Sequence, residues 1–156
     1  MKINPGDSAP DFTLFSANKE EVKLSDQKGK NVVLLFFPLA FSGVCTDEVC
    51  QVRDGLSDYQ NMNAEVFGIS VDSPFTLDAF GKSHNLNFDL LSDFNKDVST
   101  EYGVLHEQFA FGMEGVSMRS AFVIDKDGVV RYSEITENPG VLPNFEAIAS
   151  TLNGLN

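Results

Sequence analysis

The sequence predicts an α/β domain in which helices flank a mixed β-sheet on both sides. Asn31–Phe37 is rich in branched and aromatic residues with no polar alternation, and Glu65–Val71 is a second such run. Strands of this kind are buried on both faces, and each run is followed by a segment with helical apolar spacing. The chain has 156 residues, enough for one domain with its own core. We therefore expect residues 1–156 to form a single domain.

A β-hairpin is expected before the first buried strand, because Asp11–Phe15 and Glu21–Leu24 alternate apolar and polar residues. After that strand, apolar residues at helical spacing predict a helix over Ser42–Asn61. The second buried strand is followed by another helix at Phe75–His84, so strands and helices alternate through the middle of the chain.

The remaining elements are shorter. A strand, a helix and a closing helix are expected at Leu90–Leu91, Lys96–Tyr102 and Pro143–Leu152. Pro143 suits the first turn of the closing helix. An Asp-Gly pair at 127–128 marks a hairpin turn between strands at Ser120–Asp125 and Val129–Ile135. The resulting order, ββ then βαβα then ββα, resembles that of a thioredoxin fold with an added N-terminal hairpin.

The composition narrows the range of partners. Asp and Glu outnumber Lys and Arg by 23 to 11, which gives a net charge of −12. An acidic surface repels nucleic-acid phosphates and anionic lipids, so we expect neither a nucleic-acid nor a membrane partner. The longest apolar run is about ten residues, half of what a spanning helix needs, and no apolar signal region is visible at the N-terminus. We expect a cytoplasmic protein.

Two cysteines, Cys45 and Cys50, lie near the start of the helix expected over Ser42–Asn61. If Ser42 caps this helix, Cys45 occupies its third position, where unpaired N–H groups and the helix dipole favour a thiolate. One helix end contributes about 1 kcal/mol, so a reactive thiolate also needs a nearby cation. The alternative is that both thiols are inert core residues, because free cysteine is among the residue types most often buried.

Three arginines are candidates for this cation. Arg53 lies in the same helix, roughly 12 Å along its axis from Cys45. Arg119 enters an expected buried strand, where a lone guanidinium needs a partner that a thiolate would supply. An Asp or Glu is an equally open partner for Arg119. Arg131 is the third candidate.

Other chemistries fit the sequence less well. A disulfide oxidoreductase has two residues between its cysteines, whereas four separate Cys45 and Cys50. His84 and His106 are 22 residues apart, far from zinc-finger spacing, so we expect no metal and no cofactor. Three acidic residues of the first long helix are expected to form a solvated face: Asp47, Glu48 and Asp54.

The segment Pro38-x-x-x-Ser42-x-x-Cys45 resembles the signature of the peroxiredoxins, thiol peroxidases that reduce hydroperoxides. The resemblance implies that Cys45 is the nucleophile, that the Ser42 hydroxyl binds the peroxide and that Pro38 shields the thiolate. Arg119 opens a segment similar to the family's Arg-x-x-Phe-Val-Ile-Asp strand, and by resemblance it would activate the thiolate and bind substrate. Glu48 resembles the family's common Glu three residues after the nucleophile, which implies a supporting role.

The similarity runs from Gly6 to about Gly140. It implies a thioredoxin-like fold, hydroperoxide substrates, a thioredoxin-like or low-molecular-weight thiol as reductant, and a homodimer. The stretch before Cys45 resembles the alkyl hydroperoxide reductase E branch, whereas Cys50 resembles the second cysteine of the bacterioferritin-comigratory (PrxQ) branch. A further alternative is a protein that keeps the fold but binds partners and has lost peroxidase activity. The presence of all four motif residues, Pro38, Ser42, Cys45 and Arg119, argues against this alternative.

The spacing of the two cysteines sets a condition on their pairing. Residues five apart on one helix have Cα atoms roughly 8–9 Å apart, beyond the 7 Å or so that a disulfide tolerates. Cys50 can therefore resolve a sulfenic acid on Cys45 only if the first turns of the helix unwind, which Gly43 and Gly55 would ease. The alternative is that Cys50 is an inert thiol on the inner face of the helix.

Overall fold

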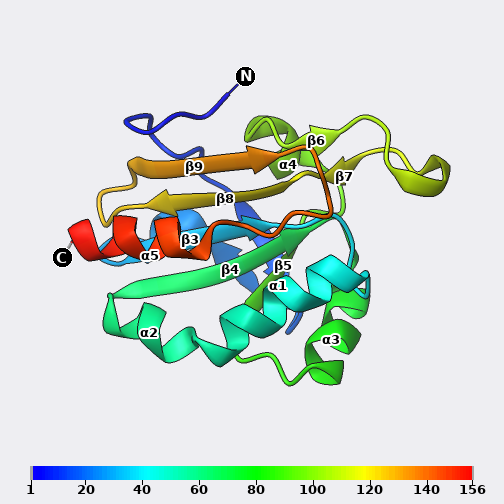
Figure 1. The fold of residues 1–156 in the computed structure, drawn as a ribbon, viewed down its shortest axis with the longest axis horizontal. Coiled ribbons are helices and arrows are strands. Elements are labelled where there is room, and N and C mark those ends of the chain that lie inside the picture. Colours follow the sequence, from blue (N-terminus) through cyan, green and yellow to red (C-terminus); the bar gives the residue numbers. More distant parts are fainter. Residues whose placement is uncertain (1, 156) are drawn as a thin grey trace.

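The structure is a computed structural model and describes residues 2–155 (Figure 1). Its strands are β1 Thr13–Ser16, β2 Glu21–Lys23, β3 Asn31–Phe36, β4 Ala64–Ser70, β5 Asp89–Ser92, β6 Leu105–His106, β7 Val116–Ser117, β8 Arg119–Ile124 and β9 Val130–Thr136. Its α-helices are α1 Gly43–Asp54, α2 Leu56–Asn61, α3 Pro74–Ser83, α4 Asp97–Glu101 and α5 Phe145–Gly154, and its 3-10 helices are η1 Leu24–Gln27 and η2 Ala110–Gly112. Within the described residues, seven strands form one sheet in the order β2-β1-β5-β4-β3-β8-β9, and β6 pairs separately with β7.

Three parallel strands form the centre of the large sheet. β4 lies between β3 and β5 and runs parallel to both, with Phe36 of β3 level with Ile69 of β4. β8 and β9 extend the sheet antiparallel on the β3 side, and the β1–β2 hairpin extends it antiparallel on the β5 side. The carboxyl ends of β3 and β4 therefore meet at one edge, and the loops that lead into α1 and α3 leave from it (Figure 1).

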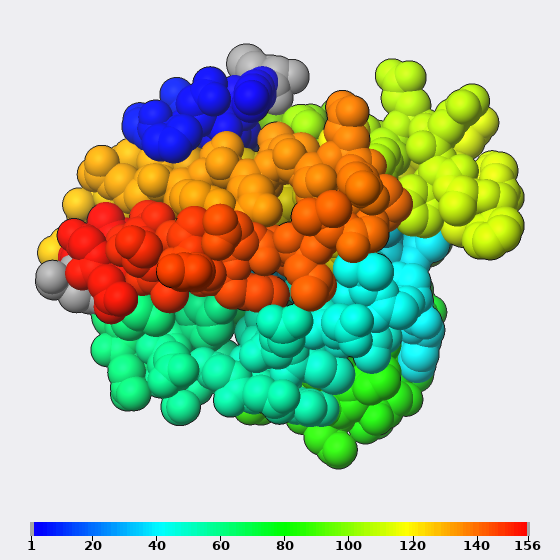
Figure 2. All heavy atoms as spheres, in the orientation of Figure 1, coloured from blue at the N-terminus to red at the C-terminus, as the bar shows by residue number. Residues whose placement is uncertain are grey.

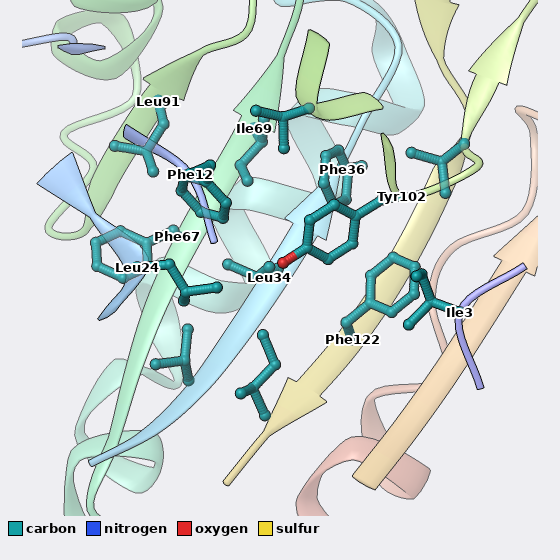
Figure 3. Close-up of a cluster of buried hydrophobic side chains, with 14 of the residues drawn as sticks. Ile3, Phe12, Leu24, Leu34, Phe36, Phe67, Ile69, Leu91, Tyr102 and Phe122 are labelled. Atoms are coloured by element: carbon teal, nitrogen blue, oxygen red, sulfur yellow. The ribbon is translucent and has the colours of Figure 1, made fainter. Parts of the chain in front are cut away.

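Side chains of the sheet alternate between two apolar layers. On one side, the ring of Tyr102 lies 5.5 Å from that of Phe36 and 5.3 Å from that of Phe122, centroid to centroid (Figure 3). On the other side, Val33 and Leu35 of β3 pack in one cluster with residues of α1, α2 and α5. Both faces of the central strands are thus covered, and the predicted mixed sheet with flanking helices is confirmed.

Two predicted helix boundaries are wrong. The expected single helix over Ser42–Asn61 is two helices, because the chain leaves helical geometry at Gly55, whose φ and ψ are −105° and 13°. Glycine stabilises a helix poorly and favours such a break. The closing helix begins at Phe145, and Asn144 caps it by accepting a hydrogen bond from the N–H of Ala147 at 3.0 Å. Pro143 therefore lies outside the helix rather than in its first turn.

The segment between α4 and β8 forms an arm that the sequence does not predict. β6 and β7 pair to form its base, and η2 forms its tip, where Phe111 is 98% exposed. Figure 2 shows this yellow-green segment standing out from the body of the molecule. Among residues 2–155, no helix has the length and apolar character that crossing a membrane requires.

Candidate active site

The loop between β3 and α1 brings the first of the predicted site residues to the sheet edge. Pro38 is buried two residues after the end of β3, and Phe41 adopts a left-handed backbone with φ of 70°. Ser42 then caps α1 with extended backbone, but its hydroxyl makes no bond to the helix. Instead, Ser42 Oγ donates to the carbonyl of Leu39 at 2.9 Å. This hydroxyl is at the exposed rim of the loop and belongs to a residue that solvent reaches.

Cys45 occupies the third position of α1, as the sequence predicts, and its side chain is fully buried. Val49, Leu77 and Phe80 belong to the apolar cluster around it. Arg119, at the start of β8, donates from Nη2 to Cys45 Sγ at 3.2 Å. Because β8 runs antiparallel to β3, its first residue lies at the edge where β3 ends and α1 begins. The predicted meeting of this arginine and this thiol is therefore present.

Glu48 is also part of this buried group. Its side chain is fully buried, and Oε1 accepts a hydrogen bond from Nη1 of Arg119. The expectation that Glu48 belongs to a solvated helix face is therefore wrong, although its helix neighbours Asp47 and Asp54 are exposed. Cys45 and Glu48 are three residues apart on one helix and share a face, so the burial of the first brings the second inward.

The electrostatics of this pair follow from its burial. Burial raises the pKa of Glu48 to about 7, although the neighbouring guanidinium acts to lower it. For Arg119, burial acts to lower the pKa, but Glu48 and Cys45 outweigh that effect and raise it. Within residues 2–155, Glu48 Oε2 and Arg119 Nε are buried without a hydrogen-bond partner. The guanidinium is therefore a fixed cation that faces the sulfur and the carboxyl together.

A third group holds Arg119 in place. Its Nη2 also donates to the carbonyl of Pro139 at 2.9 Å, in the loop between β9 and α5. This orange loop lies against the cyan residues of α1 in Figure 2. Pro139 is not a residue that the sequence marks as part of a site, because a backbone carbonyl leaves no signature in the sequence. Side chain and main chain together fix the orientation of the guanidinium.

The other two arginines bind elsewhere. Arg53 donates to the carbonyl of His84 at 2.6 Å and to the carboxylate of Asp54 at 2.9 Å. Arg131 pairs with Asp125 at 2.7 Å, between its Nε and a carboxylate oxygen. Of the three candidates, Arg119 is therefore the cation beside Cys45.

Cys50 is half-buried in the same helix, and both cysteines are free thiols. α1 runs unbroken from Gly43 to Asp54, so the two Cα atoms are roughly 8–9 Å apart by helix geometry. The pair cannot bond in this conformation. Among residues 2–155, no three His, Cys, Asp or Glu side chains gather as a metal-binding group.

Known proteins resemble this chain along most of its length. The model of the AhpC/TSA family matches residues 5–133. Alkyl hydroperoxide reductase E of Mycobacterium tuberculosis is 41% identical over 141 residues, which cover 88% of each chain. Peroxiredoxin-2 of Bos taurus is 40% identical over 148 residues, covering 88% of this chain and 72% of that protein.

Solved structures agree with the fold. The crystal structure of the peroxidoxin BcpB from Mycobacterium tuberculosis covers 99% of both chains with a TM-score of 0.87 and 28% identity. A peroxiredoxin-like protein from Aquifex aeolicus covers all of this chain and 90% of its own, with a TM-score of 0.90 and 25% identity. The similarity therefore extends over the whole sheet and the helices that flank it.

Proposed function

This chain belongs to the AhpC/TSA family and is a thiol-dependent peroxidase, and we propose that Cys45 is the thiol that attacks the peroxide. The observation that carries this proposal is the hydrogen bond from Arg119 to Cys45 Sγ at 3.2 Å. A guanidinium beside a buried sulfur at a helix start favours the thiolate, which is the nucleophilic form. The proposed substrates are hydrogen peroxide and organic hydroperoxides.

The first step is a displacement at oxygen. The Cys45 thiolate attacks one peroxide oxygen, so that a sulfur–oxygen bond forms as the oxygen–oxygen bond breaks. The sulfur is oxidised to a sulfenic acid, and the peroxide is reduced to water or an alcohol after its leaving oxygen takes up a proton. Arg119 and the N–H groups at the start of α1 stabilise the charge that develops on the two oxygens.

We assign supporting roles to the residues around the thiol. The Ser42 hydroxyl rotates from the Leu39 carbonyl to donate to the bound peroxide. Pro38, which is buried and has no N–H, keeps water away from the sulfur. Glu48 fixes the guanidinium by its hydrogen bond to Nη1.

For the second step, we propose that Cys50 condenses with the sulfenic acid to give a disulfide and one water molecule. An external dithiol, such as a thioredoxin-like protein, then reduces this disulfide. The first turns of α1 must unwind for the two sulfurs to meet. Gly43 and Asp47 on this segment are exposed, so unwinding must release mainly the buried side chain of Cys45. Direct attack by a small external thiol is the alternative.

The proposed assembly is a homodimer. Exposed phenylalanines support it, since Phe41, Phe75 and Phe94 are 53%, 72% and 62% exposed in the single chain. Light scattering at micromolar concentration measures the mass and tests this proposal. We also propose a cytoplasmic location, since two cysteines in 156 residues are too few for the disulfide framework that many secreted domains use.

Peroxide consumption by three proteins tests the proposed function. With a dithiol reductant, the wild type should turn over and Cys45→Ser should be inactive. Cys50→Ser should lose turnover with the dithiol at low concentration and recover it with a small monothiol, which attacks the sulfenic acid directly. A Cys45→Ser protein that consumes peroxide at the wild-type rate would rule out Cys45 as the reacting thiol.

A further inference from the structure

Asp72 connects the loop before α1 to the neighbouring strand of the sheet. The N–H of Ala40, in the middle of this loop, donates to Asp72 Oδ2 at 2.7 Å. The same oxygen accepts from the hydroxyl of Ser70 at 2.7 Å. Asp72 follows β4, which is the sheet neighbour of β3. A carboxylate at the end of β4 therefore holds the loop that connects β3 to α1.

The position of Asp72 is itself fixed by the ends of β4 and β5. Its N–H donates to Ser70 Oγ at 3.2 Å, and its carbonyl accepts from the hydroxyl of Ser92 at 2.6 Å. The N–H of Asp93 donates to the carbonyl of Ser70 at 2.7 Å and closes this group of bonds. Ser70 and Ser92 are both buried. The carboxylate is therefore anchored to the rigid centre of the sheet.

The loop needs such an anchor, because its own geometry is strained. Phe41 has a φ of 70°, which costs a residue with a side chain about 1 kcal/mol or more. The hydroxyl of Ser42 bonds to Leu39 within the loop rather than to the helix. The bond between Ala40 and Asp72 lies two residues before Ser42 and five before Cys45, and it supports the loop from outside.

We propose that Asp72 is a positioning residue of the peroxidase reaction, holding residues 38–42 so that Ser42 and Cys45 face the peroxide together. This inference rests on the proposed function of Cys45. Asp72 acts through the loop and is not assigned contact with the substrate. A misplacement of reacting groups by about 1 Å can cost on the order of a hundredfold in rate, so the loss of this bond affects the chemical step.

Three variants separate positioning from simple stability. Asp72→Ala removes the acceptor, and Asp72→Asn keeps an oxygen that can accept from both Ala40 and Ser70. Asp93→Ala is the matched control, because Asp93 is a buried carboxylate at the end of the next strand. It accepts from the N–H groups of Val98 and Ser99 at 3.1 and 2.7 Å and holds α4 instead of the loop.

Two rates are measured in each folded protein. One is the oxidation of Cys45 by hydrogen peroxide in a single turnover. The other is the alkylation of Cys50 by iodoacetamide in the reduced protein, which rises above the wild-type rate if α1 opens around this half-buried thiol. Asp72→Ala should slow Cys45 oxidation by about 10- to 100-fold, while Asp72→Asn and Asp93→Ala should stay close to the wild-type rate. Cys50 alkylation should be unchanged in Asp72→Ala.

The inference would be overturned if Asp72→Ala oxidised Cys45 at the wild-type rate, or if Asp93→Ala slowed this oxidation as much as Asp72→Ala does. It would also be overturned if Asp72→Asn were as slow as Asp72→Ala. Faster Cys50 alkylation in Asp72→Ala, large enough to explain its slower Cys45 oxidation, would overturn it as well. If Asp72→Ala does not fold, Asp72→Glu replaces it, because the added methylene moves the acceptor while keeping its charge. A wild-type rate in that variant would also overturn the inference.

Failure of the proposed function gives a different pattern. If peroxide does not oxidise Cys45 in the wild type, the proposed role of Cys45 is wrong. The rate at which iodoacetamide alkylates Cys45 then tests whether Asp72 positions the loop. A Cys45 alkylation rate that changes in Asp72→Ala and not in Asp93→Ala supports positioning. Equal rates in the two variants contradict it.

Discussion

Arg119 and Cys45 are 74 residues apart in sequence, and Nη2 of the first donates to Sγ of the second at 3.2 Å. The two residues meet because β8 starts at the sheet edge where β3 ends and α1 begins. The same guanidinium binds the Glu48 carboxylate and the Pro139 carbonyl. One cation is thus shared among a sulfur, an acid and a backbone oxygen, and its orientation is set from three sides.

Arg119→Lys tests the guanidinium directly. Lysine keeps the charge but cannot donate in a planar fork to the sulfur and the carboxylate at once. We expect the second-order rate of Cys45 oxidation by hydrogen peroxide to fall by about 10²- to 10³-fold, as for the loss of one transition-state donor. Arg131→Lys, at a half-exposed pair with Asp125, is the control and should keep the wild-type rate. Equal rates for the two variants would contradict the role of Arg119.

Glu48→Gln tests the buried carboxyl through the pH dependence of stability. Burial raises the pKa of Glu48 to about 7 from an ordinary value of 4.5, so the folded protein holds the proton more tightly than the unfolded chain. The resulting stabilisation is fully present below pH 4.5 and is lost as the pH rises to about 7. Glutamine does not titrate. The free energy of unfolding of wild type minus that of Glu48→Gln should therefore fall over this range by on the order of 1–3 kcal/mol.

Urea denaturation at several pH values measures this difference. Asp47→Asn is the control, because it removes a carboxylate from the exposed face of the same helix. A wild type and a Glu48→Gln protein whose unfolding free energies run parallel with pH would mean that the carboxyl titrates in its ordinary range.

Ser42 allows catalysis and stability to be separated. Its hydroxyl makes no cap bond to α1 and donates to Leu39 within the loop. Ser42→Ala should therefore change the free energy of unfolding by less than about 0.5 kcal/mol. Cys45 oxidation should slow by about 10-fold or more in the same protein, while Ser42→Thr keeps the hydroxyl and most of the rate. An unaltered rate in Ser42→Ala would remove this hydroxyl from the mechanism.

Gly43→Ala tests the unwinding of α1. An added Cβ at Gly43 meets no atom within 4 Å, so the substitution creates no clash. Alanine favours the helix over glycine by roughly 0.5–1 kcal/mol. Formation of the disulfide from the Cys45 sulfenic acid should slow by about two- to fivefold, and the oxidation step should be unchanged.

Gly154→Ala is the control for this effect, since Gly154 ends α5 and its added Cβ also meets no atom within 4 Å. Stopped-flow fluorescence or quenched mass analysis resolves the two steps. If both alanine variants form the disulfide as fast as wild type, unwinding of the first turn does not limit the second step.

The central part of the fold was predictable because its signals are local. Strands such as β3 and β4 read as unbroken apolar runs, and the motif from Pro38 to Cys45 lies at a strand end followed by a helix start. The break at Gly55 was missed, because a single glycine inside a helical pattern is often tolerated. The boundaries of a helix depend on the residues that pack against its ends in the folded protein, and the sequence alone does not show which residues these are.

The site was predictable where its residues carry their own chemistry. A thiol at a helix start and a buried arginine that needs a partner made the Cys45–Arg119 contact one of several open pairings, and the resemblance to the peroxiredoxins selected it. The three-residue spacing from Cys45 indicated that Glu48 could be buried, because both residues share one helix face. The burial of this carboxyl also depends on the position of Arg119 beside it. Asp72 reaches the loop before α1 only because β4 lies next to β3 in the sheet. Pro139 contributes a backbone carbonyl to Arg119. No local sequence pattern predicts either contact.

The intact mass of the protein after one equivalent of hydrogen peroxide, without reductant, shows whether Cys45 is the reacting thiol and whether Cys50 pairs with it. We expect a loss of about 2 Da in wild type, from a Cys45–Cys50 disulfide, and a gain of about 16 Da in Cys50→Ser, from the sulfenic acid. A gain of about 16 or 32 Da in wild type would show that Cys50 does not resolve Cys45. No rapid change in either protein would contradict the assignment of Cys45 as the reacting thiol.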